Sequence, residues 1–86
     1  MKSPTVERYL RAKLEHPRAV VFVTVGVFCQ TFFEDAAFCH RALRLVARDM
    51  AAASEPEKIL MCGIPRDKLE KYVTLLRGVE RETHVE

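Results

Sequence analysis

The apolar run AVVFVTVGVF, residues 19–28, constrains the fold of this chain more than any other segment. It is rich in β-branched side chains and lacks the apolar–polar alternation of a strand with one wet face. Such a run predicts a central strand that is covered on both faces, with Gly26 at the turn where the strand ends. Thr24 and Gly26 interrupt the run, and it is too short to cross a bilayer.

Helical patterns lie on both sides of this strand. A helix is expected over 3–17, because a serine and a proline form a good helix start and another proline follows at the far end. A second helix is expected over 30–44, where apolar side chains gather on one face. Glu34 and Asp35 then fall in its first turns, where the helix dipole favours acids.

The second half of the chain also alternates between strand and helix patterns. Residues 44–50 and 59–64 predict short strands, separated by a loop over 51–58 that carries a serine and a proline. A helix is expected over 65–78, opening at its proline, and an edge-like strand over 79–86. The resulting order, αβαββαβ, predicts an α/β (α+β) domain with a small mixed β-sheet flanked by helices.

The composition predicts one small folded domain over residues 1–86. The chain is 49% hydrophobic and 30% charged, which is typical of a globular protein rather than a disordered one. Its formal net charge of +2 permits contact with nucleic acid but does not require it. Three cysteines without CxxC spacing predict free thiols, and the polar first residues show no secretory signal. We therefore expect a cytoplasmic protein without a membrane partner.

Catalytic and cofactor chemistry finds little support in the motifs. The sequence contains neither a GxxxxGK[ST] phosphate loop nor a GxGxxG fingerprint, so no cofactor is expected in this chain. Cys39 and His40 are adjacent, and adjacent side chains on a helix do not face each other, so no metal site is expected either. No local signature supports a Cys–His nucleophile, and Glu34 with Asp35 is more simply a pair of helix-start charges than a catalytic pair. We predict that the chain is not an enzyme.

Basic residues near the N-terminus leave two interpretations open. They form a solvated helix face in the simpler one, and contact DNA in the other. These residues are Arg8, Arg11, Lys13 and Arg18.

Three segments, taken in order, resemble the N-terminal domain (domain I) of the MutS mismatch-repair family. SPTVERYLRAKLEHP, from Ser3, is similar to the family's opening helix, where a Thr-Pro, a Gln-Tyr-Leu and a His-Pro recur. AVVFVTVGVFCQTFFEDA resembles its hydrophobic strand followed by Gly-Asp-Phe-Tyr-Glu and a second Phe-Tyr motif. ILMCGIPRDKLEKYVTLL resembles its Pro-Met-Ala-Gly-Ile-Pro-Tyr-His and the helix after it. The resemblance implies a MutS domain I-like fold and a single such domain over 1–86, either complete or cut from a longer chain.

The resemblance also implies a function and two site residues. In that family the domain inserts a phenylalanine into the minor groove at a mispaired or unpaired base, and a nearby glutamate hydrogen-bonds the distorted base. Phe28 takes the place of that phenylalanine, and Gln30 stands where the glutamate would be. Cys29 replaces the tyrosine between them, and Val27 replaces the aspartate before them. The implied partners are double-stranded DNA with a mismatch or bulge and the remaining domains of a MutS-like protein, which would carry the ATPase.

Two interpretations of Phe28 follow. A phenylalanine in a strand is usually buried, whereas the resemblance favours a side chain that leaves the surface at the turn after Gly26. Phe32, Phe33 and Phe38 are assigned to the core. A basic surface beside an exposed Phe28 would favour DNA binding, and a sealed Phe28 or an acidic surface would favour protein interaction.

The altered motif supports an alternative function. With Val27, Cys29 and Gln30 in place of family residues, the chain could be a degenerate MutS-like domain that acts as a protein-interaction or structural module. If it does bind DNA, the neutral Gln30 should be repelled less by ordinary duplex than a glutamate, and selectivity should weaken.

Overall fold

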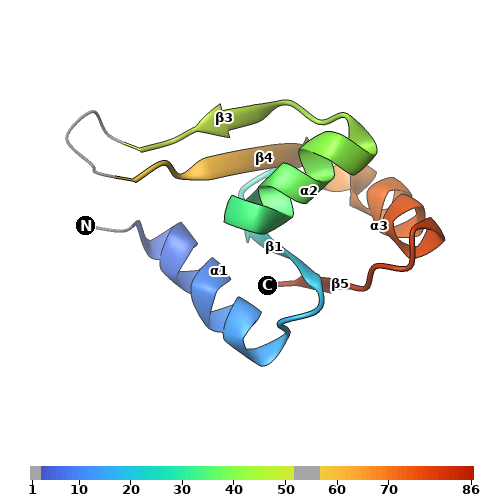
Figure 1. The fold of residues 1–86 in the computed structure, drawn as a ribbon, viewed down its shortest axis with the longest axis horizontal. Helices are drawn as coiled ribbons and strands as arrows, with labels where there is room; N and C mark the ends of the chain where they lie inside the picture. The colour runs from blue at the N-terminus through green and yellow to red at the C-terminus, as the bar shows by residue number, and fades with distance from the viewer. Residues whose placement is uncertain (1–2, 52–56) are drawn as a thin grey trace.

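The computed structural model describes residues 3–51 and 57–86. Over these residues the chain forms three α-helices, a short 3-10 helix and five strands (Figure 1). In chain order they are α1 (Pro4–Glu15), β1 (Val20–Val25), β2 (Phe28–Phe32), α2 (Phe33–Leu43), β3 (Ala47–Asp49), β4 (Leu60–Pro65), η1 (Arg66–Lys68), α3 (Leu69–Gly78) and β5 (Thr83–Val85).

The strands form one mixed sheet in the order β3-β4-β2-β1-β5. The β1–β2, β2–β4 and β3–β4 pairs are antiparallel, and β5 pairs with β1 in parallel. The predicted class, a small mixed sheet flanked by helices, is therefore confirmed. The last strand lies at the edge of the sheet, as predicted.

The predicted order αβαββαβ lacks one strand. Residues 28–32, which the sequence pattern divided between a strand end and a helix start, form β2 and run back antiparallel to β1. Gly26 and Val27 make a two-residue hairpin loop, and Gly26 has the positive φ of 59° that such a loop favours at its first position. The continuous apolar run therefore contains β1, the turn at Gly26 and Val27, and the first residue of β2. Gly26 is the only glycine in this turn.

Two of the three helices begin later in the sequence than predicted. The second helix begins at Phe33, not at residue 30, because the five residues before it are committed to β2. Pro65 ends β4 in an extended conformation, and η1 intervenes before α3 begins at Leu69. The first helix follows the prediction closely, with Ser3 accepting a hydrogen bond from the backbone N–H of Val6 as its N-cap.

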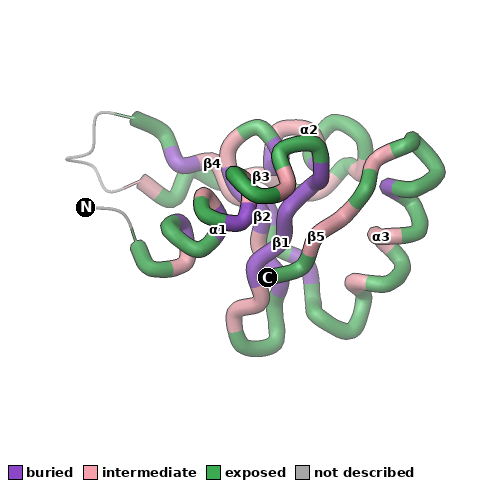
Figure 2. The backbone as a smooth tube through the Cα atoms, turned by 90° about the horizontal axis from the view of Figure 1, so that it is seen from below, coloured by how far each residue is buried: buried purple, intermediate pink, exposed green. Residues whose placement is uncertain are grey.

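Two apolar clusters, one on each face of the sheet, hold the fold together. On one face α1 packs against β1 and β2, with Val6, Tyr9 and Phe32 among the buried residues. On the other face α2 and α3 pack against the sheet, and Cys39 and Cys62 lie in that cluster. Figure 2 shows the buried residues concentrated along the central strands and the exposed ones on the outer helices and turns. The central strand is thus covered on both faces, as its composition predicted.

Two further sequence expectations concern the loop over 51–58 and the absence of a membrane span. The loop predicted over 51–58 falls largely on 52–56, which lie outside the described residues. Among the described helices, none combines the length and the apolar character needed to cross a membrane.

Candidate nucleic-acid interface

The β1–β2 hairpin presents Phe28 at the surface. Val25 and Phe28 are the cross-strand pair that closes the loop, so Phe28 is the first residue of β2. Its side chain is 50% exposed, and the neighbouring Val27 is 72% exposed. The backbone N–H of Arg66 donates to the Val27 carbonyl over 2.7 Å, which ties the hairpin tip to the end of β4. The hairpin tip lies at the lower edge of the molecule in Figure 2, where exposed residues follow one another.

The exposed interpretation of Phe28 is therefore confirmed, with a correction to its position. The sequence placed Phe28 on the turn itself, whereas it sits within the strand ladder, between Val25 on one side and Pro65 on the other. A side chain held by two neighbouring strands has a better defined direction than one on a free loop.

The second predicted site residue, Gln30, shares a face of β2 with Phe28. Successive side chains along a strand alternate between faces, so residues 28, 30 and 32 point to the same side. Gln30 is half-buried and lies opposite Gly63 of β4. The structure thus brings both predicted site residues to one surface, and their role in DNA binding stays a prediction.

An open hollow of about 370 Å³ lies on this face beside Phe28, and we call it the sheet hollow. β2, β4 and β3 supply its walls and floor. It is lined by Phe28, Gln30, Val46, Arg48, Met61 and Gly63. Arg48 alone carries a charge among these residues.

A second hollow, of about 620 Å³, lies on the other side of Phe28, at the hairpin tip. Its lining is mainly apolar and includes Val27 and Pro65, together with Arg66 and Asp67. Across both hollows, two arginines therefore stand against one acid. The surface beside Phe28 is mildly basic, which is the condition set above as favouring DNA over protein interaction.

The sequence did not single out Arg48, Gly63 or Arg66. They belong to β3, β4 and η1, and only the sheet topology brings them beside Phe28. A correct strand order would have predicted the pair of Gln30 with Gly63, but the sequence pattern had no β2.

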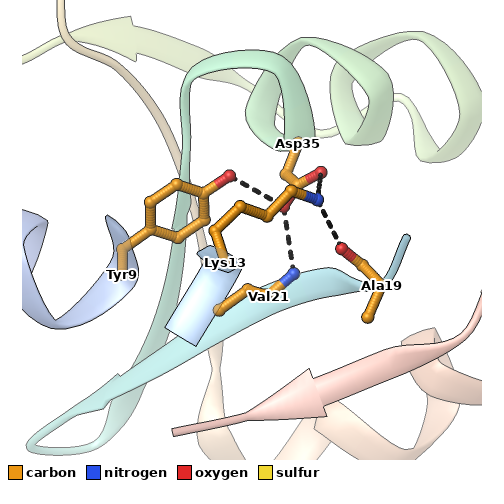
Figure 3. Close-up of polar contacts among 5 residues, drawn as sticks. All are labelled: Tyr9, Lys13, Ala19, Val21 and Asp35. Carbon is orange, nitrogen blue, oxygen red and sulfur yellow. Dashed lines mark hydrogen bonds and ion pairs between the residues drawn. The ribbon is translucent and has the colours of Figure 1, made fainter. Parts of the chain in front are cut away.

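A buried polar cluster lies near the start of β1, away from the hairpin (Figure 3). Asp35, at the start of α2, is only 3% exposed. Its carboxylate accepts hydrogen bonds from the Tyr9 hydroxyl at 2.7 Å, from Lys13 Nζ at 3.0 Å and from the backbone N–H of Val21 at 3.1 Å. Lys13 also donates to the Ala19 carbonyl. Burial, and then the hydrogen bond to Asp35, raise the pKa of Tyr9 well above its usual range.

Asp35 therefore has a structural role that the sequence interpretation missed. The sequence pattern predicts a helix-start charge, yet Asp35 joins α1, β1 and α2 at the point where β2 leaves the sheet. Lys13, one of the basic residues for which the sequence left a solvated helix face and DNA contact open, is its ion-pair partner. No sequence signal identified this pairing, because the two residues come from different helices.

The thiols occupy a dry part of the core. Cys29, Cys39 and Cys62 are free and fully buried. Burial, with a smaller effect from the Cys62 thiol, raises the pKa of Cys39 to about 12. A thiol with such a pKa stays neutral and unreactive at physiological pH. Within 3–51 and 57–86, no three His, Cys, Asp or Glu side chains come together in a way that could hold a metal ion.

The fold and this surface define a small α+β domain that projects an apolar side chain from a hairpin beside arginines. The family model for MutS domain I matches residues 3–86, and the chain belongs to that family. It is 37% identical over 76 residues to the DNA mismatch repair protein MutS of Desulforamulus reducens and 40% identical over 76 residues to that of Bacillus subtilis strain 168. Each match covers 86% of this chain and 8% of the relative, so the chain spans less than a tenth of the proteins it resembles.

Proposed function

We propose that this chain is a DNA-binding module that recognises mispaired or unpaired bases in duplex DNA, within a MutS-like mismatch-repair protein. The observation that carries the proposal is Phe28, a large apolar side chain left 50% exposed by a closed hairpin, with Arg48 and Arg66 lining the hollows beside it. The similarity of the chain to proteins named DNA mismatch repair protein MutS supports the same function. The ATPase of such a protein would lie outside this chain.

Phe28 would act as a wedge between base steps. Inserting an apolar side chain from the minor groove unstacks neighbouring bases and kinks the duplex, at a cost of about a few kcal/mol per step. A mispaired or unpaired base is already poorly stacked, so the same insertion costs less there. Recognition would then depend on how easily the DNA deforms rather than on its sequence.

Gln30 would meet the distorted base through its amide. An amide both donates and accepts hydrogen bonds and carries no charge, whereas a glutamate accepts only and is repelled by phosphates. We therefore expect tighter binding to ordinary duplex, and weaker discrimination, than a glutamate at this position would give.

A second candidate function rests on the hairpin tip. Val27 is 72% exposed, and the hollow beside it is mainly apolar, which suits contact with another protein surface. In this alternative the domain is a degenerate relative that serves as an interaction or structural module. The acid-poor surroundings of Phe28 favour the DNA-binding function.

The deciding experiment measures binding of the chain at low salt to duplexes with a G·T mismatch or a one-base bulge and to a matched duplex. Substitution of Phe28 by alanine should lower affinity for the bulged duplex by about 10-fold or more, since a base stacked on an aromatic side chain is worth about 1–3 kcal/mol. The control is Leu14→Ala on α1, which removes an exposed apolar side chain far more open than Phe28 and should leave binding unchanged. We expect the unsubstituted chain to bind the mismatched and bulged duplexes more tightly than the matched one. The Phe28→Ala chain should bind all three duplexes with equal affinity. Undiminished discrimination in Phe28→Ala would reject the wedge.

The Gln30→Glu substitution tests the second site residue. It should weaken binding to matched duplex more than to the bulged duplex, so that the ratio of the two affinities rises. An unchanged ratio would show that Gln30 does not determine selectivity, and it would not affect the proposed role of Phe28.

A further inference from the structure

Two histidines stack against each other where the end of α1 meets β5. The rings of His16 and His84 lie nearly parallel, with centroids 3.8 Å apart and an angle of 17° between their planes. His16 is the C-cap of α1, and His84 pairs in parallel with Val21 of β1 (Figure 1). Val21 belongs to the cluster that α1 covers, so His84 lies on that face of the sheet. The stack therefore joins two segments that are far apart in the sequence.

The charges around the stack compensate one proton but not two. Nε2 of His84 lies 3.1 Å from a carboxylate oxygen of Glu86, so a proton on His84 has an anionic partner. His16 ends a helix, where the dipole favours a cation, but within 3–51 and 57–86 no acid forms an ion pair with it. β1 carries no charged residue. The other charged residues on the segments that meet here are Lys13, whose ammonium is already paired with Asp35, and Glu15, Arg18 and Glu82.

We infer that the His16–His84 stack is a pH-sensitive switch that controls the attachment of β5 to α1 and β1. The stack is closed while at most one ring is protonated, and it opens when both are. The face of an aromatic ring attracts a cation, so a single charge is accepted. Two imidazolium rings at the observed separation repel each other, because like charges a few Å apart interact strongly at a half-buried site.

The direction of the pH effect follows from proton binding. When β5 is released, the two rings are apart and each takes up its proton freely, whereas in the stack the first proton opposes the second. Release of β5 therefore takes up a proton, and the closed state loses stability as the pH falls through the ordinary histidine range, near about pH 6.5. Neither β1 nor β2 contains a histidine, so the pairing of the hairpin strands should not respond in this way.

Amide hydrogen exchange followed by NMR measures the release of β5. The backbone hydrogen bonds that flank the β1–β5 pairs run from Val20 to Glu82, from Glu86 to Phe22 and from Thr24 to Glu86, each from N–H to carbonyl. The protection factors of these three donor amides should fall by about 10-fold between about pH 7.5 and about pH 5. Amides in the β1–β2 ladder should keep their protection over the same range.

Substitutions that keep a ring but remove a proton site isolate the cause. His84→Phe preserves an aromatic ring in the stack, so it should retain at pH 5 the protection that the unsubstituted chain loses, and His16→Phe should do the same. The matched control is His40→Gln, because this third histidine lies in the last turn of α2 and contacts the Leu45 carbonyl, outside the stack. It should leave the loss unchanged. Glu86→Gln removes the anionic partner of His84 and should enlarge the loss.

The outcome decides the inference without any measurement of DNA binding. Full protection of β5 in the unsubstituted chain at pH 5 would overturn the switch, and so would an equal loss in the two phenylalanine variants. If one of these variants does not fold, the other carries the test, and Glu86→Gln, at an exposed residue, carries it if neither folds. The proposed function stands in either case, because the wedge at Phe28 does not depend on the stack.

Discussion

Phe28 and Phe32 lie on the same strand and point to the same face of the sheet, yet one is half exposed and the other is buried. Phe28 is 50% exposed, and Phe32 is 3% exposed. The difference is the cover: Tyr9 of α1 packs edge-on against Phe32, with ring centroids 5.6 Å apart, whereas Phe28 lies outside the apolar cluster that α1 forms with the sheet. One sheet face thus serves as core at one end and as candidate binding surface at the other.

The comparison shows that exposure of an aromatic residue in this fold depends on helix placement rather than on the strand. The position of α1 is set by the Asp35 cluster, which binds Tyr9 and Lys13 at the Phe32 end of β2. The same contacts that bury Phe32 leave the hairpin free. Substitution of Phe32 should therefore affect mainly the stability of the fold, and substitution of Phe28 mainly DNA binding.

The largest effect is expected from truncating the covered residue. Phe32→Ala should lower the free energy of unfolding by about 4 kcal/mol, since it removes a buried aromatic side chain and leaves a cavity beneath Tyr9. Phe28→Ala should cost less than about 1 kcal/mol, because half of its surface is already in water. Urea unfolding of both variants measures the difference. Similar losses in the two would mean that Phe28 contributes to the core and that the comparison fails.

The Asp35 cluster gives the next largest effect. Asp35→Ala should lower the free energy of unfolding by about 3 kcal/mol, because it leaves the Tyr9 hydroxyl, the Val21 N–H and the Lys13 ammonium without their shared acceptor. Asp35→Asn keeps the shape and one acceptor oxygen and should lose less. Urea unfolding again provides the measurement, with Glu34→Ala, an exposed acid one residue earlier, as the control. Equal effects of Asp35→Ala and Glu34→Ala would reduce Asp35 to the helix-start charge that the sequence suggested.

The sequence predicted the parts of this comparison that depend on local pattern. The β-branched run, the Ser-Pro helix start and the acids at 34 and 35 each have a local physical signature, and the elements they predicted are present. The hairpin did not have one, because a single glycine in an apolar run also suits a strand end. Since β2 was missed, the opposition of Gln30 and Gly63 and the cover of Phe32 by α1 could not be predicted, because they depend on long-range pairing.

The hairpin turn itself should give an intermediate effect. Gly26→Ala places a side chain in the left-handed region at φ 59° and should cost about 1–2 kcal/mol. Gly78→Ala is the matched control, because this glycine ends α3 without a positive φ and a Cβ there meets nothing within 4 Å. We expect the control to be neutral or slightly stabilising in urea unfolding. A turn variant as stable as the control would show that the hairpin adapts, and that Phe28 is held less firmly than the ladder suggests.

The last effect, similar in size to that of the turn and seen only at alkaline pH, concerns the face behind both phenylalanines, where the cysteines lie. Burial raises the pKa of Cys39 to about 12, and it raises that of Cys62 as well. Because the folded pKa lies above the unfolded one, the contribution to stability is full below the unfolded pKa, near 8.5, and is lost as the pH rises toward the folded value. The free energy of unfolding should therefore fall by about 1–2 kcal/mol between about pH 8 and pH 10, measured in the presence of a reductant. Cys39→Ala should flatten this decline even though it lowers stability at neutral pH. If the free energy of unfolding falls equally with pH in both chains, water reaches the Cys39 thiol. The face under α2 and α3 would then be less well covered than its buried residues indicate.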